Sequence, residues 1–200
     1  VVCRRQRQMC IRDRESRGTK FNWSNYWKNL VMRVNWQHWH KAVTPERCEE
    51  IKKLCYETGD FREATIFKDG QYIPYNNVRE TKIAWVADQS LRDLVSFYLL
   101  EANRNAFGFI VDYLPDIQFG EYSEGSFYNW HYDVNWEGTT LYDRKLSLVI
   151  QLSDEEDYEG GNFEFKDLEQ PVGFRSQGSI LVFPSYICLL YTSDAADDIP

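Results

Sequence analysis

Residues 118–133 read Gln-Phe-Gly-Glu-Tyr-Ser-Glu-Gly-Ser-Phe-Tyr-Asn-Trp-His-Tyr-Asp and end in the sharpest chemical signal of the sequence, His131-Tyr132-Asp133. On a β-strand, residues i and i+2 point to the same face, so an imidazole and a carboxylate would converge on one point. With one further histidine they would form the two-His-one-carboxylate triad that holds Fe(II) and leaves positions open for substrate and oxygen. By itself the His-x-Asp pair fits a hydrogen-bonded strand pair better, so the neighbouring residues decide.

The neighbouring residues extend the signal into a longer pattern, Tyr-x-x-Gly-x-x-Tyr-x-x-His-x-Asp. It is formed by Tyr122, Gly125, Tyr128, His131 and Asp133, and further matches follow at Arg144, Ser147, residues 152–154, Gly160-Gly161 and residues 178–185. In these motifs the chain resembles the 2-oxoglutarate and Fe(II)-dependent dioxygenases of the prolyl-4-hydroxylase-like group, which includes virus-borne and bacterial members. The resemblance runs from about residue 36 to residue 186.

Short segments separated by turns fill the second half of the chain, which indicates a β-sandwich or barrel. The predicted strands are residues 116–123, 127–133, 145–152, 162–166, 171–175 and 179–184. In the third of them the even-numbered residues are aliphatic and suit packing against helices. Its odd-numbered residues, Ser147, Val149 and Gln151, suit the lining of a polar cavity. The family resemblance implies an α+β fold: a double-stranded β-helix (jelly-roll) sandwich with flanking N-terminal helices, truncated at its C-terminal end.

Two helices are predicted ahead of these strands, over residues 45–57 and 91–106. The first begins at Thr44-Pro45, an N-cap followed by proline at the first helical position, and the second at a capping box formed by Ser90 and Asp93. Both carry apolar side chains at helical spacing, as expected of helices that pack on the outer face of a sheet. Shorter strands are predicted at residues 36–43 and 81–87, and residues 60–80 show no clear pattern.

The family resemblance also implies roles for four residues. His131 and Asp133 would bind Fe(II) and be the catalytic residues. Tyr122 would contact the distal carboxylate of 2-oxoglutarate, and Ser147 would lie near this cosubstrate. The structural alternatives are a core tyrosine with a satisfied hydroxyl and an ordinary strand serine. The implied reaction consumes O2 and 2-oxoglutarate, releases succinate and hydroxylates a C–H bond, with ascorbate as the reductant.

The same family needs a second histidine and a basic residue towards the end of the domain. Aligned on residues 183–186, the histidine should fall near residue 189, where Leu189 stands, and Cys188 beside it would be an unusual replacement. The basic residue that pairs with the 2-oxoglutarate carboxylate should fall near residue 199, where Ile199 stands. We therefore expect a complete dioxygenase from the parent gene, but impaired iron binding in this chain.

Both ends of the chain look foreign to the domain. Residues 1–14 and 187–200 resemble translated sequencing-adapter DNA, and a natural basic arm and acidic tail is the alternative. The predicted organisation is an adapter-like segment (1–14), an uncertain extension (15–35) in which Met32 is a candidate start, an incomplete dioxygenase domain (36–186) and an adapter-like tail (187–200). Neither adapter-like segment is expected to join the core.

Composition limits the classes of function. A chain of 200 residues that is 43% hydrophobic can form one domain with a sizeable core, and no apolar run reaches the length of a membrane span. A net charge of −8 argues against nucleic acid as the partner, because such binding needs Lys and Arg to neutralise phosphates. Cys48 and Cys55 share one helix face, which indicates core thiols in a reducing compartment, and no signal peptide is visible.

Two classes of function stay open. The first is a 2-oxoglutarate-dependent hydroxylase acting on a protein side chain, prolyl above all, or on a small molecule, in the cytoplasm (the host cytoplasm if virus-borne). The second is a non-catalytic jelly-roll module that binds a sugar or peptide, with His131 and Asp133 merely structural. No phosphate loop, nucleophile elbow or zinc cysteine cluster supports a third chemistry. His38 and His40 are interpreted as surface or packing residues, and the sequence does not indicate the substrate or the oligomeric state.

Overall fold

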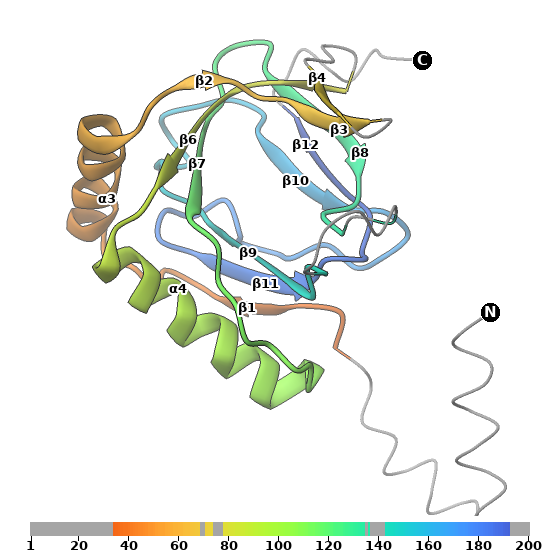
Figure 1. The fold of residues 1–200 in the computed structure, drawn as a ribbon. Helices are drawn as coiled ribbons and strands as arrows, with labels where there is room; N and C mark the ends of the chain where they lie inside the picture. The colour runs from red at the N-terminus through yellow and green to blue at the C-terminus, as the bar shows by residue number, and fades with distance from the viewer. Residues whose placement is uncertain (1–33, 69–70, 74–77, 135, 137–142, 193–200) are drawn as a thin grey trace, which may run out of the picture. The chain divides into compact units, whose positions relative to one another are not determined.

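Antiparallel strands are the main secondary structure of this protein, whose computed structural model describes residues 34–68, 71–73, 78–134, 136 and 143–192 (Figure 1). Within this part of the chain the sheets have the orders β1-β11-β9, β10-β12-β8-β5, β2-β6-β7 and β3-β4. The strands are β1 (Gln37–Trp39), β2 (Arg62–Glu63), β3 (Ile66–Lys68), β4 (Gln71–Ile73), β5 (Arg79–Glu80), β6 (Lys82–Val86), β7 (Ile117–Glu121), β8 (Phe127–His131), β9 (Leu146–Ile150), β10 (Asn162–Phe165), β11 (Ile180–Pro184) and β12 (Leu189–Thr192). The expected α+β class with antiparallel sheets is therefore confirmed.

Strand β11 is buried on both faces because each face meets a separate apolar cluster. Ile180 and Val182 belong to the cluster that includes the helices, and Leu181 and Phe183 belong to an aromatic cluster on the other side. The neighbouring strand β9 alternates in the same way. Its even-numbered leucines and isoleucine pack on the helical cluster, as the sequence predicts, while Ser147 and Gln151 are buried on the opposite face.

Helix α3 (Pro45–Thr58) begins as predicted, with the Thr44 hydroxyl accepting a hydrogen bond from the Arg47 amide. Helix α4 (Gln89–Ala102) begins earlier than predicted. Its N-cap is Asp88, whose carboxylate accepts from the Leu91 amide, so the capping box predicted at Ser90 is wrong. A π-helical turn, η2 (Asn103–Phe107), continues α4 and ends at Gly108, which has φ +67°.

The two helices lie outside the sheets, α4 beside β9 and β11 and α3 beside β6 (Figure 1). Cys48 and Cys55 face inward from α3 as free, buried thiols, which confirms the prediction of core cysteines. Burial raises the pKa of Cys55 to about 11, so this thiol stays protonated and unreactive near neutral pH. Among the described residues, no helix is long and apolar enough to cross a membrane.

The expectation that residues 187–200 stay outside the core is wrong for residues 187–192. Strand β12 pairs with β10 on one side and β8 on the other, so it lies inside its sheet. Ile187 and Leu189 are only 8% and 5% exposed, and both join the aromatic cluster. Sheet hydrogen bonds and burial of alternate apolar residues hold this segment, whatever its origin. The predictions for residues 1–14, 15–33 and 193–200 lie outside the described residues.

Two further secondary-structure predictions need correction. Residues 171–175 form turns instead of a strand, and Phe174 packs into the aromatic cluster from there. The unpatterned residues 60–80 contain β2, β3, β4 and β5. These strands are only two or three residues long, too short to show an alternating pattern. Strands β3 and β4 pair with each other, whereas β2 and β5 pair with β6 and β8 outside this segment.

Gly178→Ala is expected to lower the free energy of unfolding by more than about 3 kcal/mol. The added Cβ would lie 1.8 Å from the Val43 carbonyl oxygen, and φ at this glycine is +79°. Gly125→Ala is the matched control, with φ +78° and no atom within 4 Å of the added Cβ, so it carries backbone strain alone, about 1–2 kcal/mol. Urea denaturation measures both variants, and equal losses would contradict the clash.

Candidate metal and cosubstrate site

His131 and Asp133 converge, as their spacing predicts. His131 ends β8 and Asp133 follows it, with His131 Nε2 and Asp133 Oδ1 3.5 Å apart. The imidazole is oriented from its other side, because His131 Nδ1 lies 2.7 Å from the Asn129 carbonyl oxygen. The main chain of Asp133 is fixed as well, since its amide donates to the Ser185 carbonyl oxygen beyond the end of β11. An imidazole nitrogen and a carboxylate oxygen, both of kinds that bind Fe(II), therefore lie close together.

Asp133 is held in its ionised form. Burial alone would raise the pKa of this carboxyl, but hydrogen bonding to His131 and the positive charge of Arg144 outweigh it and hold the pKa below its ordinary value. The Arg144 guanidinium lies 3.9 Å from Asp133 Oδ1 and is about half exposed. An ionised, partly buried carboxylate beside an imidazole is ready to accept a cation.

Tyr122 and Ser147 both line the cavity onto which His131 and Asp133 open. Tyr122 packs against Tyr191 of β12, with ring centroids 4.5 Å apart. Burial raises the pKa of Tyr122 to about 12, so its hydroxyl keeps its proton and can donate a hydrogen bond. Ser147 is buried, with its hydroxyl 2.9 Å from that of Ser185. The structure thus brings together all four residues singled out in the sequence.

Leu189 stands directly opposite His131, because the register of β12 on β8 pairs their Cα atoms. Leu189 lines the same cavity and provides no donor atom. Cys188 does not line the cavity, so it does not replace the missing histidine. Within the described part of the chain, no three His, Cys, Asp or Glu side chains form a group that could hold a metal ion. These residues therefore fit two of the three protein positions of an iron triad and leave the third to leucine.

Three further residues complete the cavity wall near His131, and the sequence pattern did not assign them a role. The Tyr128 ring stacks on the His131 imidazole, with ring centroids 3.3 Å apart. The positively charged guanidinium of Arg79 lies over the Tyr128 ring, 4.4 Å from its centre. Gln118 accepts a hydrogen bond from Arg79 at 3.0 Å. Arg79 lies at the edge of the unpatterned segment 60–80, so no periodic signal marked it.

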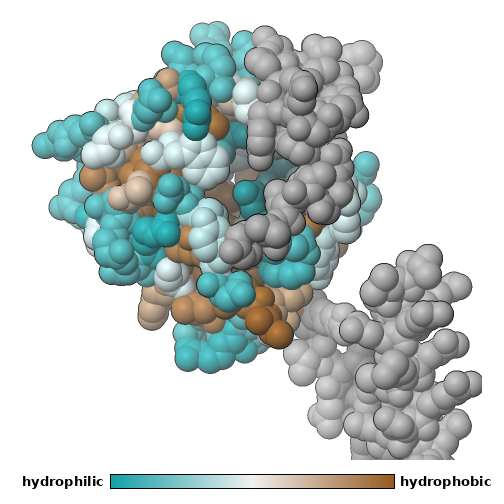
Figure 2. All heavy atoms as spheres, viewed as in Figure 1, coloured by the Kyte–Doolittle hydropathy of each residue, from teal (hydrophilic) through white to brown (hydrophobic). Residues whose placement is uncertain are grey.

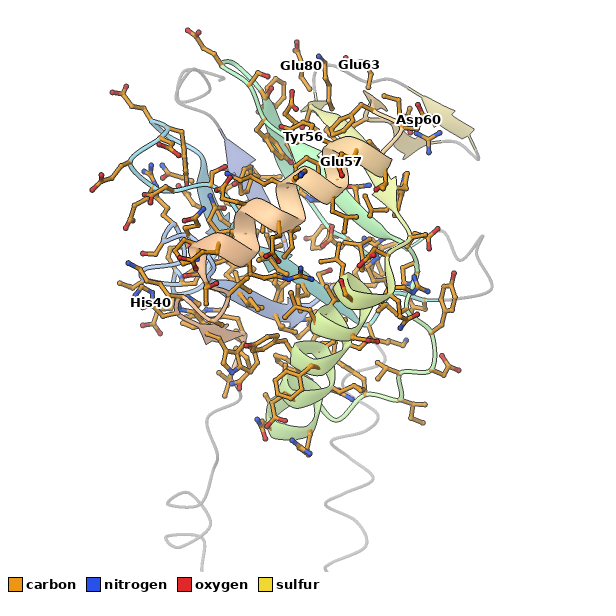
Figure 3. All side chains as sticks on the ribbon, turned by 90° about the vertical axis from the view of Figure 1, so that its left-hand side faces the viewer. His40, Tyr56, Glu57, Asp60, Glu63 and Glu80 are labelled. Atoms are coloured by element: carbon orange, nitrogen blue, oxygen red, sulfur yellow. The ribbon has the colours of Figure 1, made fainter. Side chains whose placement is uncertain are left out.

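Two tryptophans close to His131 and Asp133 in the sequence, and the two histidines near β1, differ in their relation to this cavity. Trp136 lines the cavity and is 69% exposed, in keeping with a place at its mouth, whereas Trp130 does not line it. His38 and His40 contact each other on and beside β1, and His38 also contacts Phe174. Figure 3 shows His40 at the edge of the molecule, and neither histidine lines the cavity. Figure 2 shows the molecular face of Figure 1 hollowed near its centre.

A family model matches part of the chain. Residues 117–189 match the model of the 2OG-Fe(II) oxygenase superfamily, a segment that begins with β7 and ends at Leu189. No curated protein sequence matches the chain.

Solved structures of prolyl hydroxylases share the fold. A Pseudomonas putida prolyl-4-hydroxylase matches with a TM-score of 0.57 and 18% identity, over 85% of this chain and 91% of that one. A viral collagen prolyl hydroxylase from Paramecium bursaria Chlorella virus-1, in complex with 2OG, matches with 0.56 and 15% identity, over 80% and 90%. A Trichoplax adhaerens prolyl hydroxylase, in complex with a hypoxia inducible factor peptide fragment, matches with 0.60 and 16% identity, over 88% and 96%.

Proposed function

We propose that this chain, which residues 117–189 assign to the 2OG-Fe(II) oxygenase superfamily, derives from a hydroxylase of the prolyl-4-hydroxylase-like group whose iron site is incomplete here. The observation that carries the proposal is the 3.5 Å approach of His131 Nε2 to Asp133 Oδ1 in a cavity shared with Tyr122 and Ser147. We further propose that the sheets β1-β11-β9 and β10-β12-β8-β5 are the two halves of a double-stranded β-helix, the fold that the family resemblance implies.

Each residue of the site has a defined task in this function. His131 and Asp133 present two donor atoms to a metal ion, and the contacts described above fix their orientation. Tyr122 offers a protonated hydroxyl to a carboxylate, and Ser147 supports the cavity wall beside Ser185. Iron and 2-oxoglutarate, when bound, supply the oxidising chemistry, while the protein supplies position and a partly dry cavity.

The substrate we propose is a prolyl residue of a peptide, with other protein side chains and small molecules as alternatives. Two relatives of similar fold are prolyl hydroxylases described with 2OG or with a peptide, and Trp136, which lines the cavity, is exposed. Oxygen is the second cosubstrate of this proposal, and ascorbate is the reductant. A proline-rich peptide that gains one oxygen atom by mass spectrometry would identify the substrate class.

The unmodified chain is expected to form little succinate from 2-oxoglutarate in the presence of Fe(II) and ascorbate. Leu189 provides no donor atom, so only His131 and Asp133 hold the metal, and loss of even an outer partner of a metal ligand typically costs 10–100-fold. The assay needs no peptide, because slow uncoupled turnover of 2-oxoglutarate reports the active site. A turnover rate in this chain equal to that of the Leu189→His variant would contradict the role given to position 189.

The non-catalytic binding module remains the second candidate, because Leu189 stands where the third metal ligand is required. In that case the cavity binds a peptide or sugar without turnover. The origin of the chain ends bears on the choice, and we keep as a proposal that residues 1–14 and 187–200 are adapter-derived. The sequence of the parent gene beyond codon 186 tests this: a histidine near 189 and a basic residue near 199 would support the oxygenase.

A further inference from the structure

Arg79 is a buried cation. It begins β5, where its Cα pairs with that of Tyr128 on β8, and its residue is only 9% exposed. Buried arginines are rare because removing a charge from water is costly unless an opposite charge or a full set of hydrogen bonds compensates. The surroundings of Arg79 therefore show whether the structure provides that compensation.

The described residues provide only part of it. Arg79 Nη2 donates to Gln118 Oε1 at 3.0 Å, and the guanidinium lies over the face of Tyr128. Arg79 Nε has no hydrogen-bond partner, and none of the ion pairs among the described residues involves Arg79. A guanidinium has five N–H donors and no acceptor. Besides Gln118 and the Tyr122 hydroxyl, the described residues give this one no further partner at Nε and no carboxylate to balance its charge.

The position of Arg79 relative to His131 limits what can supply the missing charge. The Tyr128 ring contacts both the Arg79 guanidinium, 4.4 Å from its centre, and the His131 imidazole, whose ring centroid lies 3.3 Å away. The hydroxyl of Tyr122, which interacts with Arg79, lines the same cavity. An anion held at Arg79 is therefore about one aromatic ring away from the metal-binding donors, a span suited to a short molecule with an anionic group at each end.

We propose that Arg79 binds the far carboxylate of a short dicarboxylate, of the class of 2-oxoglutarate, and so supplies from β5 the cation that the end of this chain lacks. This inference rests on the proposed function, because it takes the other end of the ligand to lie at His131 and Asp133. Tyr122 donates the second hydrogen bond to the same carboxylate. Ile199 stands where the family resemblance implies a basic residue, and Arg79 of β5 would provide the positive charge in its place.

The charge distribution of the protein favours a small anion over an acidic macromolecule. The chain carries a net charge of −8, and Figure 3 shows Glu57, Asp60, Glu63 and Glu80 near one another at the surface around the end of α3 and β2. An acidic protein or nucleic acid would be repelled by such an exterior. A dicarboxylate is small enough to enter the cavity and forms charge-assisted hydrogen bonds once inside.

The test is a calorimetric titration of the metal-free full chain with 2-oxoglutarate and with 2-oxobutanoate, which has the same keto-acid head but no far carboxylate. Arg79→Gln is expected to weaken binding of 2-oxoglutarate at least tenfold and to leave binding of 2-oxobutanoate unchanged. Arg79→Lys should retain part of the affinity as a point charge. Arg104→Gln, which removes an exposed arginine on η2, is the matched control and should change neither affinity.

Thermal denaturation separates this role from a structural one. Without ligand, Arg79→Gln is expected to melt at or above the temperature of the unmodified chain, because it removes an uncompensated buried charge. Saturating 2-oxoglutarate should then raise the melting temperature of the unmodified chain more than that of Arg79→Gln. A lower melting temperature for ligand-free Arg79→Gln, with no selective loss of 2-oxoglutarate binding, would show that Arg79 is structural and overturn the proposal.

The remaining outcomes separate the two proposals. The dicarboxylate site is overturned if the unmodified chain binds 2-oxoglutarate no more tightly than 2-oxobutanoate. It is also overturned if Arg79 proves necessary for binding an acidic peptide instead. Arg79-dependent binding of 2-oxoglutarate by a Leu189→His chain that forms no succinate supports the site and overturns the oxygenase function. Succinate formation by that chain with a KM for 2-oxoglutarate that Arg79→Gln does not change supports the function and overturns the site.

Discussion

Leu189→His is expected to raise the affinity of the full chain for Fe(II) by more than about a hundredfold, since a missing first ligand should cost more than the 10–100-fold typical of its supporting partners. The Cα atoms of residue 189 and His131 are partners in the pairing of β12 with β8. Residues directly opposite in an antiparallel pair place their side chains on the same face, a few ångströms apart. A histidine at 189 would thus face the point on which His131 and Asp133 converge.

The same substitution has an opposite effect in the absence of metal. Leu189 is buried in the aromatic cluster, and replacing it with an imidazole removes apolar contacts and introduces polar nitrogen atoms. The metal-free variant should therefore melt at a lower temperature than the unmodified chain. Fe(II), or Co(II) as an oxygen-stable probe, should reverse that loss, because a ligand that binds only the folded state stabilises it.

Anaerobic metal titration followed by a succinate assay measures both effects. Leu190→His is the matched control, because residue 190 is the next position on β12 and does not line the cavity. It should gain neither metal affinity nor turnover. A folded Leu189→His variant that binds metal no better than Leu190→His would show that this cavity is not an incomplete iron site.

His131→Ala and Asp133→Ala are each expected to abolish metal binding and succinate formation in the Leu189→His chain, reducing both below detection. Either change leaves two protein ligands, the number already present in the unmodified chain. Loss of Asp133 also removes the one negative charge among the three ligands. The affinity of a divalent cation for an O/N site depends strongly on that charge.

His40→Ala is the matched control for this second prediction. It removes an exposed histidine that does not line the cavity, so metal affinity and turnover should stay at the level of the Leu189→His chain. Circular dichroism and urea denaturation of each variant establish that the fold is retained. Metal binding that survives His131→Ala but is lost in His40→Ala would move the site to β1 and refute the assignment.

Local periodicity explains why so much of the site could be predicted from the sequence. His131 and Asp133 are two residues apart, so the i, i+2 spacing predicted that their side chains would converge. The structure places Asp133 just beyond the end of β8, where the Ser185 carbonyl oxygen fixes its amide. The alternation of side chains along β9 is equally local. Because successive residues of a strand face opposite sides, the sequence predicted that Ser147 lines the cavity and that the leucines pack on the helices. The Thr44 N-cap is a hydrogen bond between residues three positions apart.

Long-range pairing explains what could not be predicted. The place of β12 inside its sheet depends on its register against β8 and β10, whose sequences lie tens of residues earlier, so a segment that looked foreign still joined the core. Its composition signalled a different origin, but a strand needs only alternate apolar side chains and free backbone groups on its neighbours.

The sequence by itself predicted the two helices and the approach of the His131 and Asp133 side chains, because both depend on residues close along the chain, and the family resemblance implied the α+β class. Only the tertiary structure decided that Leu189 faces His131 and that Arg79 is buried beside Tyr122 and Tyr128. Register between distant strands and the desolvation of a charge are properties of the packed state, because they depend on which segments exclude water from one another.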